Sequence, residues 1–180
     1  MLPSIELRIQ NLIKALSQVV LPAIDPGNAL AREQAQLVIG HLQLIAVQWD
    51  KALPFEAQSL AALRELGQRL ASAAEGGSET VQAAAQLREA LAVREDGAAL
   101  ATVVRASAAL GSAIDSLIRA ASADGAAGFR AQLDQAVLEH GALQAWRERV
   151  WFAGNGLDPD PSALPSIDEM LGGARPPRPA

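Results

Sequence analysis

The chain has 180 residues, of which half are hydrophobic and 19% are charged, a composition typical of globular proteins that form an apolar core. It contains no Cys, which excludes disulfides, thiolate metal sites and cysteine nucleophiles. The formal net charge is −5, and no run of Lys or Arg forms the basic patch that attracts nucleic acids or anionic membranes. We therefore expect no nucleic-acid partner and no membrane partner.

The hydropathy pattern bears on localisation. No stretch reaches the roughly 18–20 apolar residues that a membrane span needs. The first residues lack the basic region and the continuous apolar run of a secretory signal. We expect a cytoplasmic protein. The preference for Arg over Lys, together with abundant Ala, is typical of proteins encoded by GC-rich bacterial genomes.

Apolar residues recur at helical spacing from the N-terminus onward. The first stripe has alternating steps of four and three residues and consists of Ile5, Ile9, Leu12, Leu16 and Val19. Ser4 is a suitable N-cap and Pro22 a suitable stop, which predicts a helix over 4–20. The sequence Asp-Pro-Gly-Asn at 25–28 predicts a tight turn, after which Asn28 caps the next helix.

The second predicted helix, over 29–51, is the most apolar of the chain. Its hydrophobic residues lie on nearly every side, and His41 and Trp49 fall among them. A helix that is apolar all round is buried on several sides. We therefore expect it to be either the central helix of the fold or part of a subunit interface.

Four further helices are expected over 54–74, 79–94, 98–122 and 126–153. Gly76 and Gly77 end the first of these, and Ser78 is a suitable cap for the next. Asp96-Gly97 indicates a break between the fourth and fifth helices, although one continuous, kinked helix remains an alternative. No segment alternates with period two, so no strand is expected.

The composition changes after Gly156, where Pro becomes frequent. Each Pro restricts the residue before it to extended backbone. We expect a bundle domain over 1–156 and an extended segment over 157–180 that is partly docked, with its last residues mobile. Short loops make consecutive helices neighbours. The predicted fold is thus all-α: an antiparallel bundle of about six helices with an extended Pro-rich C-terminal segment.

The two histidines are the first candidates for chemistry. His41 and His140 both fall on apolar faces of long predicted helices. Di-iron bundles place Glu three residues before each His, but Val38 and Val137 stand there in this chain. Zinc would need three or four ligands. We expect no metal, no cofactor and no catalytic residue, with each His a neutral, hydrogen-bonded side chain. Acid–base chemistry at His140 is the alternative.

Trp49, Trp146 and Trp151 make up half of the aromatic residues. The blander interpretation is that they fill the ends of an Ala-rich bundle. The functional interpretation is that they line an apolar pocket or anchor an interface.

Two guanidinium groups, on Arg147 and Arg149, lie between two of these tryptophans. They could bind the carboxylate or phosphate of a ligand through paired hydrogen bonds. We favour docking of the acidic tail, through Asp158 or Asp160.

Two acid–base pairs at a spacing of four residues, Glu65 with Arg69 and Asp115 with Arg119, are expected on solvated helix faces.

Two functions remain open. The first is a non-enzymatic binding or interaction module, self-associating as a homo-oligomer through part of the second helix. The second is an enzyme or small-molecule carrier with an apolar pocket between the second and sixth helices. The residues expected to bind its small apolar or anionic ligand are His41, His140, Trp49, Trp146, Arg147 and Trp151.

Overall fold

The computed structural model describes residues 2–93 and 99–176. Over these residues the chain is all-helical and forms no strand, as the sequence predicts. The break expected at Asp96-Gly97 lies outside the described residues, as does 177–180, the last part of the end that we expect to be mobile from about Gly172. The helices on either side of Asp96-Gly97 are assigned as two separate elements, α5 (Ser78–Ala92) and α6 (Leu100–Asp124).

The chain divides into two compact units. The hairpin unit comprises Met1–Lys51 with Glu148–Ile167, and the core unit comprises Ala52–Arg147 with Asp168–Ala180. Helix α7 (Ala127–Phe152) contributes to both units, since the division falls after Arg147. The predicted domain division, 1–156 and 157–180, stays a prediction.

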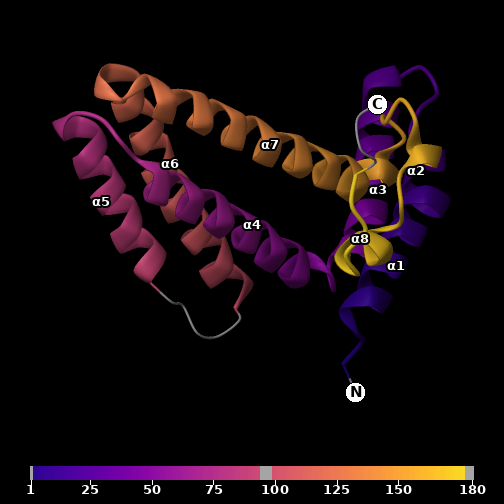
Figure 1. Ribbon diagram of the computed structural model, residues 1–180. Coiled ribbons are helices and arrows are strands. Elements are labelled where there is room, and N and C mark those ends of the chain that lie inside the picture. Colours follow the sequence, from indigo (N-terminus) through magenta and orange to yellow (C-terminus); the bar gives the residue numbers. More distant parts are fainter. Residues whose placement is uncertain (1, 94–98, 177–180) are drawn as a thin grey trace. The chain divides into compact units, whose positions relative to one another are not determined.

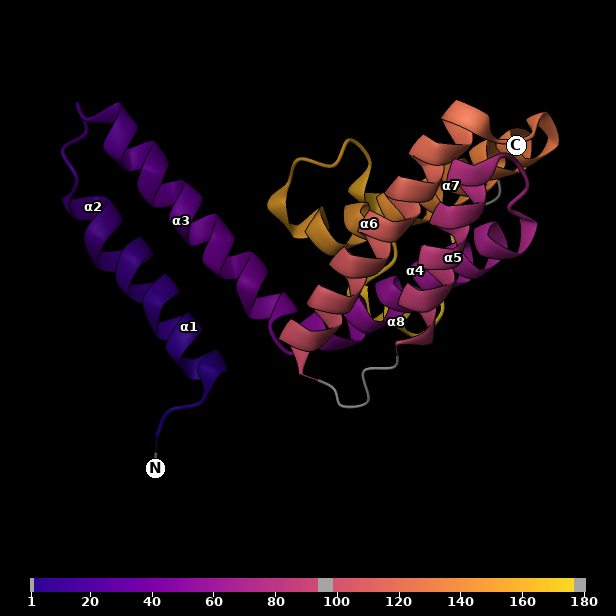
Figure 2. The same cartoon turned by 90° about the vertical axis from the view of Figure 1, so that its left-hand side faces the viewer.

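The hairpin unit begins with α1 (Ile5–Ala15), a π-helical turn η1 (Leu16–Val20) and α2 (Leu21–Ala23). Helix α3 (Ala29–Gln48) then runs back beside them (Figure 2). The two caps agree with the prediction: Leu7 N–H donates to Ser4 Oγ at 3.2 Å, and Ala31 N–H donates to Asn28 Oδ1 at 3.1 Å. The unit ends with two short 3-10 turns, η2 (Ala153–Asn155) and η3 (Pro161–Ala163).

The π turn shifts the first apolar stripe by one position. Ile9 is buried and Leu16 half-buried, as the spacing predicts, but the other three members of the predicted stripe are exposed, namely Ile5, Leu12 and Val19. After the π turn, Leu21 is the half-buried apolar residue that follows Leu16. Leu21 N–H donates to the carbonyl of Leu16, five residues back, which widens this turn. Pro22 has no N–H to continue the α-helical ladder. The predicted helix over 4–20 is therefore interrupted at its last turn.

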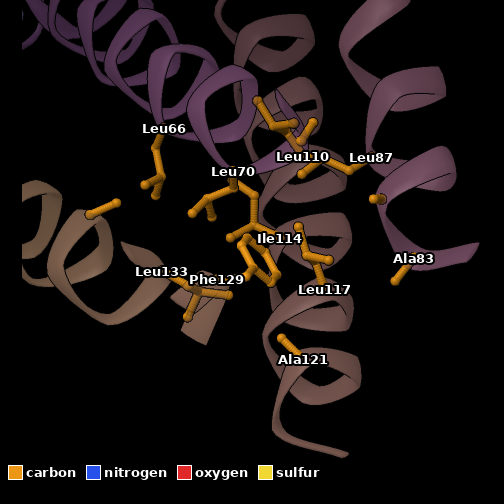
Figure 3. Packing of buried hydrophobic residues seen from close by; sticks show 13 residues of the cluster. Leu66, Leu70, Ala83, Leu87, Leu110, Ile114, Leu117, Ala121, Phe129 and Leu133 are labelled. Atoms are coloured by element: carbon orange, nitrogen blue, oxygen red, sulfur yellow. The ribbon is translucent and has the colours of Figure 1, made fainter. Parts of the chain in front are cut away.

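The core unit contains α4 (Ala52–Ala73), α5, α6 and most of α7, and it ends with the short α8 (Ile167–Leu171), whose first residue belongs to the hairpin unit. Helices α4, α5 and α6 lie side by side (Figure 1). Their apolar faces meet around the fully buried Leu70, Leu87 and Leu117, and α7 adds Phe129 (Figure 3). This is the main hydrophobic core of the described residues.

The loops after α4 and α6 approach each other closely. Gly77 N–H donates to the Asp124 carbonyl at 2.9 Å, and Ala126 N–H donates to the Glu75 carbonyl at 2.9 Å. A Cβ on Gly76 would lie 2.7 Å from Gly125 Cα, which no ordinary contact allows. Glycine at Gly76 is thus required by the approach of the two backbones.

Helix α5 is capped across this junction. The predicted cap, Ser78, is instead the first residue of the helix. The Asp124 carboxylate accepts hydrogen bonds from Glu79 N–H at 2.8 Å, Thr80 N–H at 3.0 Å and the Thr80 hydroxyl at 2.6 Å. The Thr80 hydroxyl, followed by the two backbone donors, lowers the pKa of Asp124. A residue at the end of α6 therefore fixes the start of α5.

Helix α6 differs from the expectation that no segment is apolar enough to span a membrane. By length and composition alone it is apolar enough to cross a membrane, even though it carries Asp115 and Arg119. Four of its residues are buried in the core unit, namely Leu110, Ile114, Leu117 and Ala121.

Truncating Leu117 tests this core. Leu117 is fully buried, so we expect Leu117→Ala to lower the free energy of unfolding by about 2–5 kcal/mol. Leu138 on α7 is 73% exposed, so Leu138→Ala is a matched control that should change stability by less than about 0.5 kcal/mol. Urea unfolding measures both, and equal losses would contradict the assigned core.

Candidate functional site

A shallow groove of about 250 Å³ lies in the core unit between α4 and α7. Glu65 and Arg69 line it from α4, and Glu139, His140 and Leu143 line it from α7. Glu65 and Arg69 are four residues apart, and Leu143 follows Glu139 and His140 by four and three residues, so each set shares one face of its helix. This groove brings one of the predicted histidines together with charged residues.

Ion pairing in this groove differs from the prediction. Arg69 Nη1 donates to Glu139 Oε2 at 2.6 Å, so its partner lies across the groove and is not Glu65 on its own helix. Gln135 Nε2 donates to the other oxygen of Glu139 at 2.8 Å. The Arg69 hydrogen bond, followed by that of Gln135, lowers the pKa of Glu139.

The second predicted pair, on α6, also differs. Arg119 donates to the Ser116 hydroxyl at 3.3 Å, where a pair with Asp115 was expected.

His140 is half-buried on the wall of this groove. Burial lowers the pKa of its imidazole, because the charged form loses hydration. His140 is therefore neutral over a wider pH range than a free histidine.

A second hollow, of about 680 Å³, adjoins the first and shares Ala62, Glu65 and Leu143 with it. Trp146 and Arg147 of α7 form part of its wall, and Met170 and Arg175 close it from the C-terminal segment. The residues that line it are mainly apolar. The core unit thus places three predicted ligand-binding residues, His140, Trp146 and Arg147, along one continuous depression.

Arg147 is the most unusual residue of this depression, because it is a charged residue that is only 7% exposed. Its Nη1 donates to Gln58 Oε1 at 3.0 Å, and its Nη2 donates to the Phe55 carbonyl at 3.1 Å and lies 3.5 Å from the Ser59 hydroxyl. The guanidinium carbon also lies 4.9 Å from the centre of the Phe55 ring. Arg147 therefore joins α7 to α4.

The acceptors that bind Arg147 within the described residues are all neutral, and its buried Nε–H has no hydrogen-bond partner there. Burial lowers the pKa of Arg147, while the more distant Glu56 carboxylate acts in the opposite direction. A buried charge with neutral partners is costly. The site is thus electrostatically receptive to an anion.

The tail docks through the other arginine. In the hairpin unit, Arg149 Nε and Nη2 donate to the two oxygens of Asp158, both at 2.9 Å. This bidentate bond lowers the pKa of Asp158 and raises that of Arg149. Docking of Asp158 on Arg149 is one of the pairings that the sequence predicts, and it is confirmed.

The remaining candidates belong to the hairpin unit. His41 was expected on a buried face but is exposed on α3, where it lines an open groove of about 580 Å³ together with Leu44, Phe152 and Leu157. Trp49 is exposed just after the end of α3.

Trp151 is half-buried, and its carbonyl accepts a hydrogen bond from Gln48 Nε2 at 2.7 Å. The pocket expected between the second and sixth helices would need residues of both units, and it stays a prediction.

Several residues of the depression were not predicted as ligand-binding residues, among them Glu65, Met170 and Arg175. One signal was present, since Gln58, Ala62, Glu65 and Arg69 follow each other at steps of four, three and four on one face of α4. Met170 and Arg175 come from a segment after the last long helix, and no local pattern places them beside α4.

No protein-family model, curated protein or solved structure matches this chain. Its function must therefore be inferred from its own surface, charge and packing.

The lowered pKa of His140 predicts a pH dependence of stability. Between the folded pKa and about 6.5, the unfolded chain binds a proton at this position that the folded chain does not. The free energy of unfolding should therefore decrease as the pH falls through this window, and His140→Gln should reduce that decrease. Urea unfolding at several pH values measures the slope. An NMR titration that places His140 at or above 6.5 would contradict the assignment.

Proposed function

We propose that this protein is a non-enzymatic interaction module of the cytoplasm, an antiparallel helical bundle that self-associates through its hairpin unit. The observation that carries the proposal is the uneven distribution of exposed apolar side chains between the two units. A surface with large contiguous apolar areas marks a site of protein–protein contact.

The hairpin unit buries few of its apolar residues. Among the described hydrophobic residues, its buried ones are Ile9, Leu44 and Val150, whereas the core unit buries sixteen. Conversely, fourteen of the nineteen exposed large hydrophobic residues belong to the hairpin unit. A unit with so small a core gains little stability from burial by itself.

Native mass spectrometry of the purified protein tests this proposal. We expect a multiple of 18.8 kDa at micromolar concentration, and the same sample denatured should give the single chain without additional mass. A monomer under native conditions whose surface binds no hydrophobic dye would refute self-association.

A second candidate function, carriage of a small apolar anion, is favoured by the neutral surroundings of Arg147. The hollow beside it combines Leu143, Trp146 and Met170 with a second cation, Arg175. These groups suit a ligand with an apolar body and one carboxylate. Enzymatic use of the adjoining groove would draw on His140.

Decanoate is a suitable probe of this second candidate. It should change the fluorescence of Trp146, and Arg175→Gln should weaken its binding by about tenfold through loss of one charge-assisted bond. Arg130→Gln, an exposed arginine at the other end of α7, is the matched control and should leave binding unchanged. Absence of binding at millimolar decanoate would exclude the carrier.

A further inference from the structure

We infer that a defined face of the α1–α3 hairpin binds the same face of a second copy of this chain, in a two-fold symmetric contact. The hairpin face consists of Ile5, Leu12, Val20, Val38, Ile45 and Trp49. The inference rests on the proposed self-association and specifies where and with what symmetry it occurs. All six residues belong to one compact unit, so their grouping does not involve the core unit.

Burial along α3 defines how this helix is oriented. Its half-buried residues at steps of four and three are Ala31, Ala35, Ile39, Leu42 and Ala46, and they form the side that meets α1. Leu44 is buried on the opposite side, where its methyl lies beside Gly154 of the returning chain. Val38, Ile45 and Trp49 occupy a third side, about 60° from the α1 side at 100° per residue, and all three are exposed.

Helix α1 has a matching exposed stripe. Ile9, Ile13 and Leu16 are buried or half-buried toward α3, whereas Ile5 and Leu12 lie about 60° away on the same helix and are each 52% exposed. The π turn brings Val20 into this stripe, where it is 44% exposed.

Both stripes lie on the same side of the hairpin. On each helix the exposed stripe is rotated about the helix axis by a similar angle, and in the same sense, from the residues that face the other helix. The two helices are antiparallel, so a two-fold axis perpendicular to the plane of the hairpin relates one to the other. Such an axis keeps each side of the hairpin on the same side, so the two stripes lie on one common side. Helices α1 and α3 lie side by side in the hairpin (Figure 2). The six residues therefore form a continuous apolar face on one side of it.

The other side of the same hairpin is polar. The residues displaced in the opposite sense are mainly Glu6, Gln10, Lys14, Arg32, Gln36 and Gln43. Leu7 and Val47 are the apolar exceptions, and they are as exposed as the residues of the hairpin face. The apolar side of the hairpin is therefore suited to association, and the polar side is suited to contact with solvent.

A second copy is the occupant that fits this face best. The six side chains expose about 500 Å² per chain, so a symmetric pair removes about 1000 Å² before flanking residues are counted, which reaches the lower limit of specific interfaces. The face carries no charge at its centre, so two identical faces meet without like-charge repulsion. Two apolar hairpins packed in this way form a four-helix core.

Paired lysine variants test the inference. Leu12→Lys with Ile45→Lys places charges within the hairpin face and should raise the dissociation constant of the oligomer at least 100-fold. The matched control is Leu7→Lys with Val47→Lys, which places the same charges at equally exposed positions on the polar side, about 140° and 200° away. Sedimentation equilibrium gives both constants, and circular dichroism verifies that both variants are helical.

Each outcome is decisive. Dissociation of the first variant alone supports the symmetric face. Dissociation of the control alone, or of neither variant, overturns the face while self-association itself stands. A wild-type chain that is monomeric, including one that captures a different protein instead, overturns both the face and the proposed function.

Discussion

A helix with apolar residues on three sides needs three partners, and α3 finds two of them within the hairpin unit. One side packs on α1, and the opposite side holds Leu44 against the returning chain at Gly154. The third side, with Val38, Ile45 and Trp49, stays exposed. Removal of apolar surface from water is the main favourable contribution to the free energy of association. A partner that covers this exposed third side therefore gains the most binding free energy.

The core unit is organised in the opposite way. Its apolar faces meet each other around Leu87 and Leu117, and polar side chains join its helices to one another. Asp124 caps α5 from the end of α6, and Arg147 joins α7 to α4 through neutral acceptors. The depression between α4 and α7 therefore lies on the unit that contains the main hydrophobic core of the described residues, and ligand sites are usually pre-formed on such packed elements.

The sequence predicted what local patterns determine. Helical spacing identified the elements, Ser4 and Asn28 were identified as caps, and Arg147 or Arg149 was expected to meet the acidic tail, which Arg149 does. Contacts between distant segments were not predictable in this way: Asp124 caps a helix that begins 46 residues earlier, and Arg69 bonds Glu139 on another helix. His41 was expected to be buried because α3 is apolar all round, but periodicity alone does not show which sides of such a helix receive partners.

The absence of native Cys makes one measurement especially direct. A single cysteine at Ile45, introduced as Ile45→Cys and treated with a short bifunctional thiol reagent, reports whether two copies meet at the hairpin face. Val47→Cys on the same helix is the control, with a similar exposed fraction on the polar side. The account predicts a covalent dimer for Ile45→Cys and none for Val47→Cys at micromolar concentration. Equal yields, or a dimer from Val47→Cys alone, would contradict it.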